Sequence, residues 1–249
     1  MPPVRIWDPN SYRHLILPKL NPIAWKGNPM SYTFQWRPVF RALPEMLWGA
    51  LVTLEIAILA MVIGTALAIV LALAKRSGNR AFSGLADVWI EAARNTPALF
   101  QIYMIYFGLG SLGIRVDSYT ALVVGITFNN AGYLAETFRG GFSAVPETQI
   151  RAARSLGMGA GQTMWHIVLP QMLRAVFHAM TNQMVWSILM TSLGTIVGLT
   201  SDLTGVTQQQ NVLTYRTFEL FMVAAVLYYL ISKTFTVGAR LLAWRLFRY

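Results

Sequence analysis

Hydrogen-bonding side chains interrupt the long apolar runs of this sequence at three places. Amides and hydroxyls cost free energy in lipid, so inside a membrane they usually face a helix bundle or a solute pathway. Side chains that could hydrogen-bond the carboxylate or amine of a crossing solute are Asn95, Thr96, Asn129, Asn130, Thr191 and Ser192.

Each of these three pairs has a structural alternative. Pro97 breaks the run after the first pair, which either frees backbone groups for a solute or only kinks a helix whose side chains bond to a neighbour. The two asparagines are adjacent and cannot face the same side, so one can line a pathway while the other binds another helix. The two hydroxyls can instead bond back to their own helix.

A second group of residues lies between apolar runs, at about 143–171. Pro146 and Glu147 are typical of a helix start. Arg151 follows Glu147 by four residues, a spacing that stabilises a short helix by about 0.2–0.5 kcal/mol. Gly157 predicts a left-handed helix end.

The same stretch predicts a protein-binding surface. Ala152 and Ala153 would leave an outward face with little side-chain bulk, and a second short segment, 162–169, is expected to stop at Pro170. Two short helices at a bend make a knob that can seat in a groove of another protein. A solvated linker is the alternative, although it would not need this layout.

The composition is that of a polytopic membrane protein. Of 249 residues, 55% are hydrophobic and 12% charged, and the mean hydropathy is +0.48. Lys and Arg outnumber Asp and Glu by 20 to 10, but they cluster at the ends of apolar runs, which indicates membrane orientation and not nucleic-acid binding. The absence of cysteine excludes disulfides and thiolate metal sites.

The apolar runs predict an all-α integral membrane fold with five transmembrane helices. The second run is too short to cross a bilayer alone, so this span must include some of residues 87–97. The loop between the third and fourth helices is expected to be cytoplasmic, and parity of the charge pattern puts the N-terminus outside and the C-terminus in the cytoplasm. The predicted runs are 47–74, 98–109, 119–138, 173–199 and 218–244.

Residues 1–46 are expected to form a polar tail before a membrane domain at 47–249. The tail contains eight of the eleven prolines and no compact apolar segment, so it is not a cleavable signal. Arg37 and Arg41 lie close to the first run, against the predicted external position of the N-terminus. The sequence leaves the placement of this basic tail open.

Catalytic and metal-binding patterns are lacking. His14, His166 and His178 are scattered, and no paired carboxylates or zinc-binding helix motif appear. An integral-membrane enzyme is therefore disfavoured, and no metal site is expected. A secondary transporter or channel-like homo-oligomer would fit the spans but gives the loop no role.

Several motifs in order resemble one family. The pattern R-A-A-x3-G-x9-I-x-L-P, from Arg151 to Pro170, resembles the coupling loop of ABC importer membrane subunits. TLEIAI (53–58), RNTPALFQ (94–101), ITFNNAGYLAETFRGG (126–141), ARSLGMGAGQTMWHIVLPQMLRA (153–175) and TSLGTIVGL (191–199) resemble the polar amino-acid permease branch. Together they cover most of 47–245.

The resemblance implies a permease of the bacterial inner membrane. Such a subunit pairs with a second permease, the same or homologous, binds two cytoplasmic ATPase subunits and receives a polar amino acid from an external binding protein. ATP and Mg would be bound by the ATPase, and the chain has no phosphate-binding loop of its own. The implied docking residues are Glu147, Arg151, Ala152, Ala153, Gly157, Ile167, Leu169 and Pro170.

Three positions depart from the family pattern. Arg151 replaces the usual glutamate, so it pairs either with Glu147 or with an acid on the ATPase; the internal pair demands less. Leu189 and Met190 replace a Lys-Asp pair before Thr191. This loss disfavours a pocket that clamps a charged side chain. A complex that senses or regulates, and does not transport, is left open by the sequence.

Overall fold

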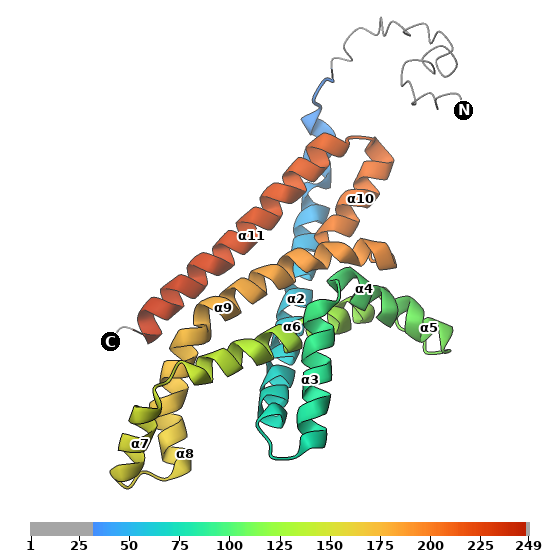
Figure 1. The fold of residues 1–249 in the computed structure, drawn as a ribbon. Helices are drawn as coiled ribbons and strands as arrows, with labels where there is room; N and C mark the ends of the chain where they lie inside the picture. The colour runs from blue at the N-terminus through green and yellow to red at the C-terminus, as the bar shows by residue number, and fades with distance from the viewer. Residues whose placement is uncertain (1–31, 248–249) are drawn as a thin grey trace, which may run out of the picture. The chain divides into compact units, whose positions relative to one another are not determined.

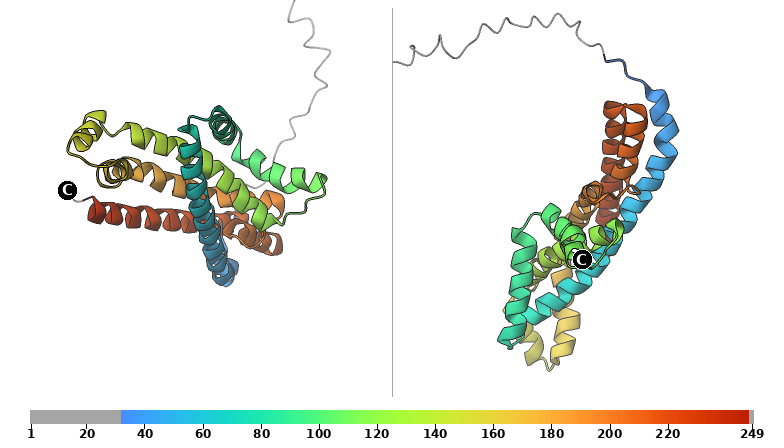
Figure 2. Two further views of the ribbon diagram at one scale, coloured as in Figure 1. Left: turned by 90° about the horizontal axis from the view of Figure 1, so that it is seen from below. Right: turned by 90° about the vertical axis from the view of Figure 1, so that its right-hand side faces the viewer.

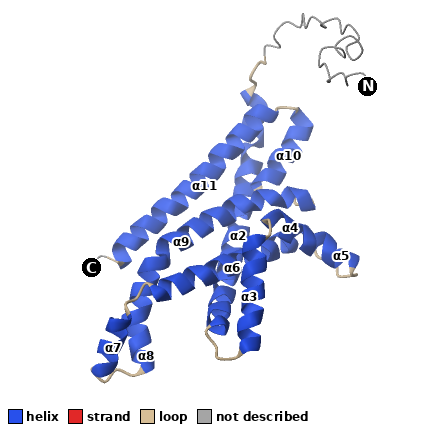
Figure 3. Cartoon of the chain, viewed as in Figure 1, coloured by secondary structure: helices blue, strands red, loops and turns tan. Residues whose placement is uncertain are grey.

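The computed structural model describes residues 32–247, and every regular element in this range is helical (Figure 3). Gln35 onward forms one compact unit. The predicted all-α class is therefore confirmed for the described residues. Residues 1–31 of the expected polar tail lie outside them.

Helix α2 (Trp36–Lys75) is the longest element and begins inside the segment expected to be a polar tail. Val39, Ala42 and Met46 are buried and pack with residues of the two helices nearest the C-terminus. This spacing of three and four is a helical face. Pro38 and Pro44 obscured this helical pattern in the sequence. Pro38 is tolerated because it lies in the first turn, where a backbone N–H would have no partner within the helix.

The second apolar run is two separate helical segments. Helix α3 (Arg80–Asn95) ends where Thr96 and Pro97 are both extended, with ψ of 145° and 135°. Helix α4 (Ala98–Tyr103), the π-helical turn η1 (Met104–Gly108) and α5 (Leu109–Ser111) follow. The break that Pro97 predicted is therefore present, because a residue before proline is driven out of the helical region. That the second span includes some of 87–97 stays a prediction.

Helix α6 (Ser118–Ser143) is the centre of the bundle and contacts α2, α3 and α4. Leu134 and Phe138 share a buried cluster with Ala68 of α2. At Gly132 an added Cβ would overlap the Ala93 side chain of α3. Glycine here lets the two backbones approach, as small residues do between membrane helices.

The C-terminal half continues through seven further elements. Helices α7 and α8 contact each other and lie at the end of the bundle away from α10 (Figures 1 and 2). The predicted fourth run, 173–199, is α-helical only to Met190 and then tightens to a 3-10 helix. These elements are α7 (Glu147–Ser155), α8 (Ala160–Thr163), α9 (Leu169–Met190), η3 (Thr191–Val197), α10 (Leu203–Thr214) and α11 (Thr217–Leu246), with a π-helical turn η2 (Met164–Val168) between α8 and α9.

Two helices of the described residues, α2 and α11, are long and apolar enough to cross a membrane, and the apolar segment Ala98–Ser111 is shorter. The count of five spans stays a prediction. Both long helices carry exposed large apolar side chains, among them Val62 and Leu230.

Candidate coupling loop and transport cavity

Helix α7 begins after the extended Pro146 and carries an ion pair on its surface. The Arg151 guanidinium donates to Glu147 Oε1 at 2.8 Å, and both side chains are more than 70% exposed. An exposed pair of this spacing contributes only a few tenths of a kcal/mol. Arg151 thus has an acidic partner within α7, in agreement with the internal pairing.

Gly157 ends α7 in the left-handed conformation, with φ of +85°, as predicted. The Met158 N–H donates to the Ala153 carbonyl at 3.2 Å, and the Gly157 N–H donates to the Arg154 carbonyl at 3.1 Å. These two bonds define a Schellman motif. No atom of the described residues lies within 4 Å of where a Cβ would stand, so the turn restricts backbone conformation and not space.

The two alanines of the loop face different ways. Ala153 is 4% exposed and turned inward, whereas Ala152 is exposed. The expectation that both face outward is wrong for Ala153, because consecutive helical residues are turned by about 100°. Two large apolar side chains of the loop were not expected at its surface: Leu156, beside Gly157, is 84% exposed, and Trp165 is 69% exposed.

The helix end expected at Pro170 is not present, and the helix continues past this residue. Helix α8, the wider turn η2 and α9 follow one another without a break from Ala160 to Met190. A proline ring clashes with the carbonyl four residues earlier in a regular α-helix, and the π-helical turn directly before it relieves that clash. Leu169 packs against the cluster around Phe138, Ile167 is half-buried and Pro170 is exposed.

The break after α3 is closed by a glutamine. The Thr96 hydroxyl donates to the Ala92 carbonyl at 2.7 Å, and Gln101 Nε2 donates to Thr96 Oγ1 and to the Ala93 carbonyl, both at 2.9 Å. Asn95, in contrast, is exposed at the end of α3. Thr96 is therefore held in place at the break, and Asn95 is not part of this network.

The adjacent asparagines diverge as predicted. Asn130 is fully buried; its Nδ2 donates to Ser187 Oγ at 2.9 Å, and its Oδ1 accepts from Gln183 Nε2 at 2.8 Å. Asn129 Nδ2 donates to the Gln101 Oε1 and to the Ala93 carbonyl, both at 3.2 Å. Asn129 Oδ1 is buried without a hydrogen-bond partner. One amide thus joins α6 to α9, and the other leaves an acceptor unused.

A cavity of about 310 Å³ opens beside Asn129. This volume is at the lower end of the range of about 300–1,000 Å³ for small-molecule sites. No charged side chain from the described part of the chain lines it. The lining residues are Thr96, Pro97, Ala98, Asn129, Tyr133, Gln183, Trp186 and Met190.

The last candidate pair lies outside this cavity. Thr191 donates to the Ile188 carbonyl at 2.8 Å, and Ser192 donates to the Leu189 carbonyl at 2.7 Å. Both hydroxyls therefore bond back to their own helix, which is the structural alternative. Of the six candidate residues, Thr96 and Asn129 line the cavity and Asn130 supports it through Gln183.

Three residues of this site were missed from the sequence. Gln101 is a polar residue in an apolar run, and that signal was present but not used. Tyr133 and Trp186 were indistinguishable from aromatic anchors at the membrane surface, because their shared cavity depends on how α6 packs against α9.

A charged cluster joins three helices at the far end of α6. Glu136 pairs with Lys75 at 3.0 Å and with Arg139 at 2.6 Å, and Lys75 also pairs with Asp87 at 2.8 Å. The pair of Glu136 with Arg139, three residues apart on α6, is thus one part of a larger network. Within residues 32–247, no group of three or more His, Asp or Glu side chains could hold a metal ion.

The helical bundle, the loop with its left-handed glycine and the uncharged cavity define a membrane transport component. The chain belongs to the family of binding-protein-dependent transport system inner membrane components, whose profile matches residues 64–248. It is therefore a permease of a binding-protein-dependent transport system. The alternative of a secondary transporter or channel-like homo-oligomer is set aside.

Characterised relatives belong to amino-acid systems. The arginine transport system permease protein ArtQ of Bacillus subtilis is 33% identical over 78% of this chain and 89% of its own. The glutamine transport system permease protein GlnP of Escherichia coli K12 is 31% identical over 86% and 98%. A crystal structure of an amino acid ABC transporter with histidines superposes with a TM-score of 0.80, at 30% identity over 86% of this chain and all of that one.

Proposed function

We propose that this chain is the permease subunit of an ATP-driven importer for a small amino acid with an uncharged, polar side chain. The similarity to arginine and glutamine permeases supports an amino acid as the solute. The observation that carries the narrower class is the cavity beside Asn129, which has polar and aromatic walls but no charged group.

The cavity has groups for both ends of an amino acid. The unused Oδ1 of Asn129 can accept a hydrogen bond from the ammonium group, and the ring of Trp186 offers a face that attracts a cation, whereas the Arg94 guanidinium already lies 5.8 Å over the Tyr133 ring. Gln183 Nε2 is engaged by Asn130, but Gln183 Oε1 on the opposite helix can accept a hydrogen bond from a side-chain amide or hydroxyl. A charged side chain would enter without a counterion, which costs far more than a neutral one.

The proposed complex couples this cavity to ATP hydrolysis on another protein. Two cytoplasmic ATPase subunits, which bind ATP and Mg, dock on α7 around Arg151, Ala152 and Gly157, and a second permease, the same or homologous, completes the pathway. An external binding protein delivers the solute. We place the loop and the C-terminus in the cytoplasm and the N-terminus outside, with five spans.

The test of the cavity is uptake by cells that express the complete system. Asn129→Ala should lower uptake of the solute at unchanged expression, and excess glutamine should compete better than excess arginine or glutamate. Asn182→Ala is a matched control, because Asn182 is exposed on α9 and does not line the cavity. Equal uptake by wild type and Asn129→Ala would reject the proposed site.

The test of the assembly is purification of the tagged chain from its native cells in mild detergent. Mass spectrometry should identify an ATPase, with or without a second permease, and thus give the stoichiometry. Recovery of a stable oligomer of this chain without any ATPase, in repeated preparations, would contradict the proposed complex.

A further inference from the structure

A basic cavity lies where the end of α2 meets the end of α6. Its volume is about 310 Å³, and three cations and no carboxylate line it. Glu136 engages two of these cations, whereas the third, Arg76, forms no ion pair among residues 32–247 and lies 5.1 Å over the Phe142 ring. The lining residues are Ala72, Lys75, Arg76, Ala135, Arg139, Phe142 and Ser143.

An apolar cavity adjoins the basic one. It has a volume of about 210 Å³, and Ala72 and Phe142 line both. Among the residues of 32–247 that line it, Thr65 is the only one with a hydroxyl group, and none is charged. The combined space therefore changes from cationic to apolar across the Phe142 ring.

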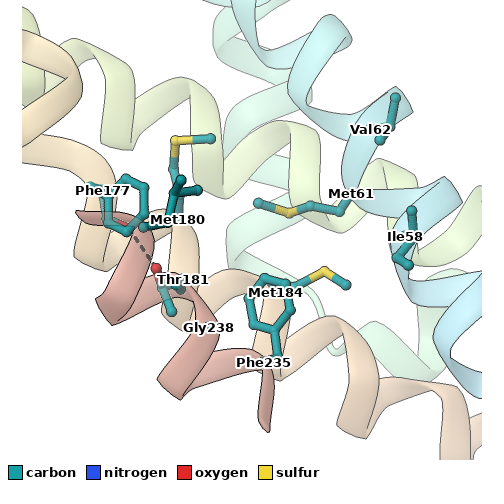
Figure 4. Close-up of a pocket in the computed structure, with 11 residues that line it drawn as sticks. Ile58, Met61, Val62, Phe177, Met180, Thr181, Met184, Phe235 and Gly238 are labelled. Atoms are coloured by element: carbon teal, nitrogen blue, oxygen red, sulfur yellow. Dashed lines mark hydrogen bonds between the residues drawn. The ribbon is translucent and has the colours of Figure 1, made fainter. Parts of the chain in front are cut away.

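The apolar cavity continues into a third, open groove between α2, α9 and α11. Met180 lines both, and the groove has a volume of about 500 Å³. Figure 4 shows Met61, Met184 and Phe235 converging on it from the three helices. Flexible methionine side chains suit an apolar occupant without fixed shape.

The depth of the apolar cavity matches one leaflet of a bilayer. Thr65 precedes Arg76 by eleven residues (76 − 65), which at about 1.5 Å per helical residue is about 16 Å along α2. Half of a hydrocarbon core of about 30 Å is about 15 Å. An acyl chain that starts at the level of Arg76 would thus end near Thr65.

We infer that these adjoining cavities bind one anionic phospholipid, with its phosphate at Arg76 and an acyl chain between α2, α6 and α9. Basic pockets between membrane helices suit anionic head groups. Glu136 holds Lys75 and Arg139 beside the phosphate and reduces, but does not cancel, their charge. The acyl chain also contacts Leu169, the first residue of α9 beyond the coupling loop. This site lies outside the proposed solute pathway.

Native mass spectrometry of the purified complex tests this site. The complex is exchanged into detergent with equal amounts of phosphatidylglycerol and phosphatidylcholine. Phosphatidylglycerol should be retained preferentially, and Arg76→Gln should weaken its binding about fivefold, the contribution of one basic residue near a membrane surface. Arg80→Gln is the matched control, because Arg80 is exposed at the start of α3 and lines neither cavity.

Three results would overturn the inference. The first is equal retention of phosphatidylglycerol and phosphatidylcholine by the wild type, or an equal loss of phosphatidylglycerol binding in Arg76→Gln and Arg80→Gln. The second is displacement of phosphatidylglycerol by millimolar inorganic phosphate, which would make this a site for a small anion. The third is a disulfide between copies of Leu173→Cys, a unique cysteine at the exposed rim of the apolar cavity, which would make the cavity a subunit interface.

Discussion

Replacing Gly157 by alanine changes only the backbone preference at the end of α7. The added Cβ meets no atom of the described residues within 4 Å, so no clash contributes. The cost is that of holding a residue with a Cβ at φ of +85°, about 1–2 kcal/mol. If the ATPase binds the loop in this conformation, the affinity should fall by about 5–30-fold.

Gly157→Asn separates backbone strain from lost surface contact. Asparagine adds more bulk than alanine but visits the left-handed region far more readily. We therefore expect the ATPase to bind Gly157→Asn more tightly than Gly157→Ala. The measurement is titration of the purified ATPase against each permease variant in nanodiscs, with ATP-driven uptake as a second readout.

Two results would refute this reasoning. Wild-type affinity of Gly157→Ala would mean that the left-handed turn is not required for docking. An equal or larger loss in Gly157→Asn would mean that the ATPase surface excludes any side chain at this position, and that the conformation of the turn is secondary.

The remaining predictions concern stability, measured by thermal unfolding of the purified protein. Asn130→Ala leaves the half-buried Gln183 Nε2 unpaired and removes one partner of the buried Ser187 Oγ, which keeps its bond to the Gln183 carbonyl; this should cost about 1–3 kcal/mol, and an unchanged midpoint would contradict the buried network. Glu136→Gln should lower the midpoint more than Asp87→Asn, because the Glu136 side chain is 14% exposed and that of Asp87 43%; the reverse order would mean that burial does not decide the strength of the Lys75 pairs. Burial raises the pKa of Asp202, in the loop before α10, from 3.8 to about 6, against the opposing hydrogen bonds of two backbone N–H groups. Because the pKa is higher in the folded state than in the unfolded state, the protonated acid is favoured on folding. About 3 kcal/mol of stability, present below about pH 4, should therefore be lost as the pH rises from about 4 to about 6. Asp202→Asn, which keeps the helix cap, should lose this pH dependence; the same pH profile in both proteins would exclude Asp202 as its source.

The elements that the sequence predicted best have strong local signals. Gly157 was expected to end a helix in the left-handed conformation and does so, because that requirement is set by neighbouring residues alone. The opposite directions of Asn129 and Asn130 also follow from helix geometry. The predicted runs 119–138 and 218–244 lie inside α6 and α11, whose apolar stretches no proline interrupts.

The features that the sequence did not predict depend on prolines and on packing between distant segments. Pro170 was expected to stop a helix, but a π-helical turn carries the chain past it. The start of α2 was hidden by Pro38 and Pro44, and its burial against α10 and α11 required their positions. The cavity joins residues of α4, α6 and α9, which no local pattern relates.

The unbroken passage from α8 through η2 into α9 has a mechanical consequence. A continuous helix transmits displacement along its axis, whereas the connection from α6 to α7 is a short non-helical segment that can bend. A displacement of α8 would therefore be transmitted along α9 to Gln183 and Ser187, the two residues that hydrogen-bond to Asn130. The walls of the cavity beside Asn129, on α6 and α9, would then shift relative to each other, so that a movement of the loop would change the shape of the cavity.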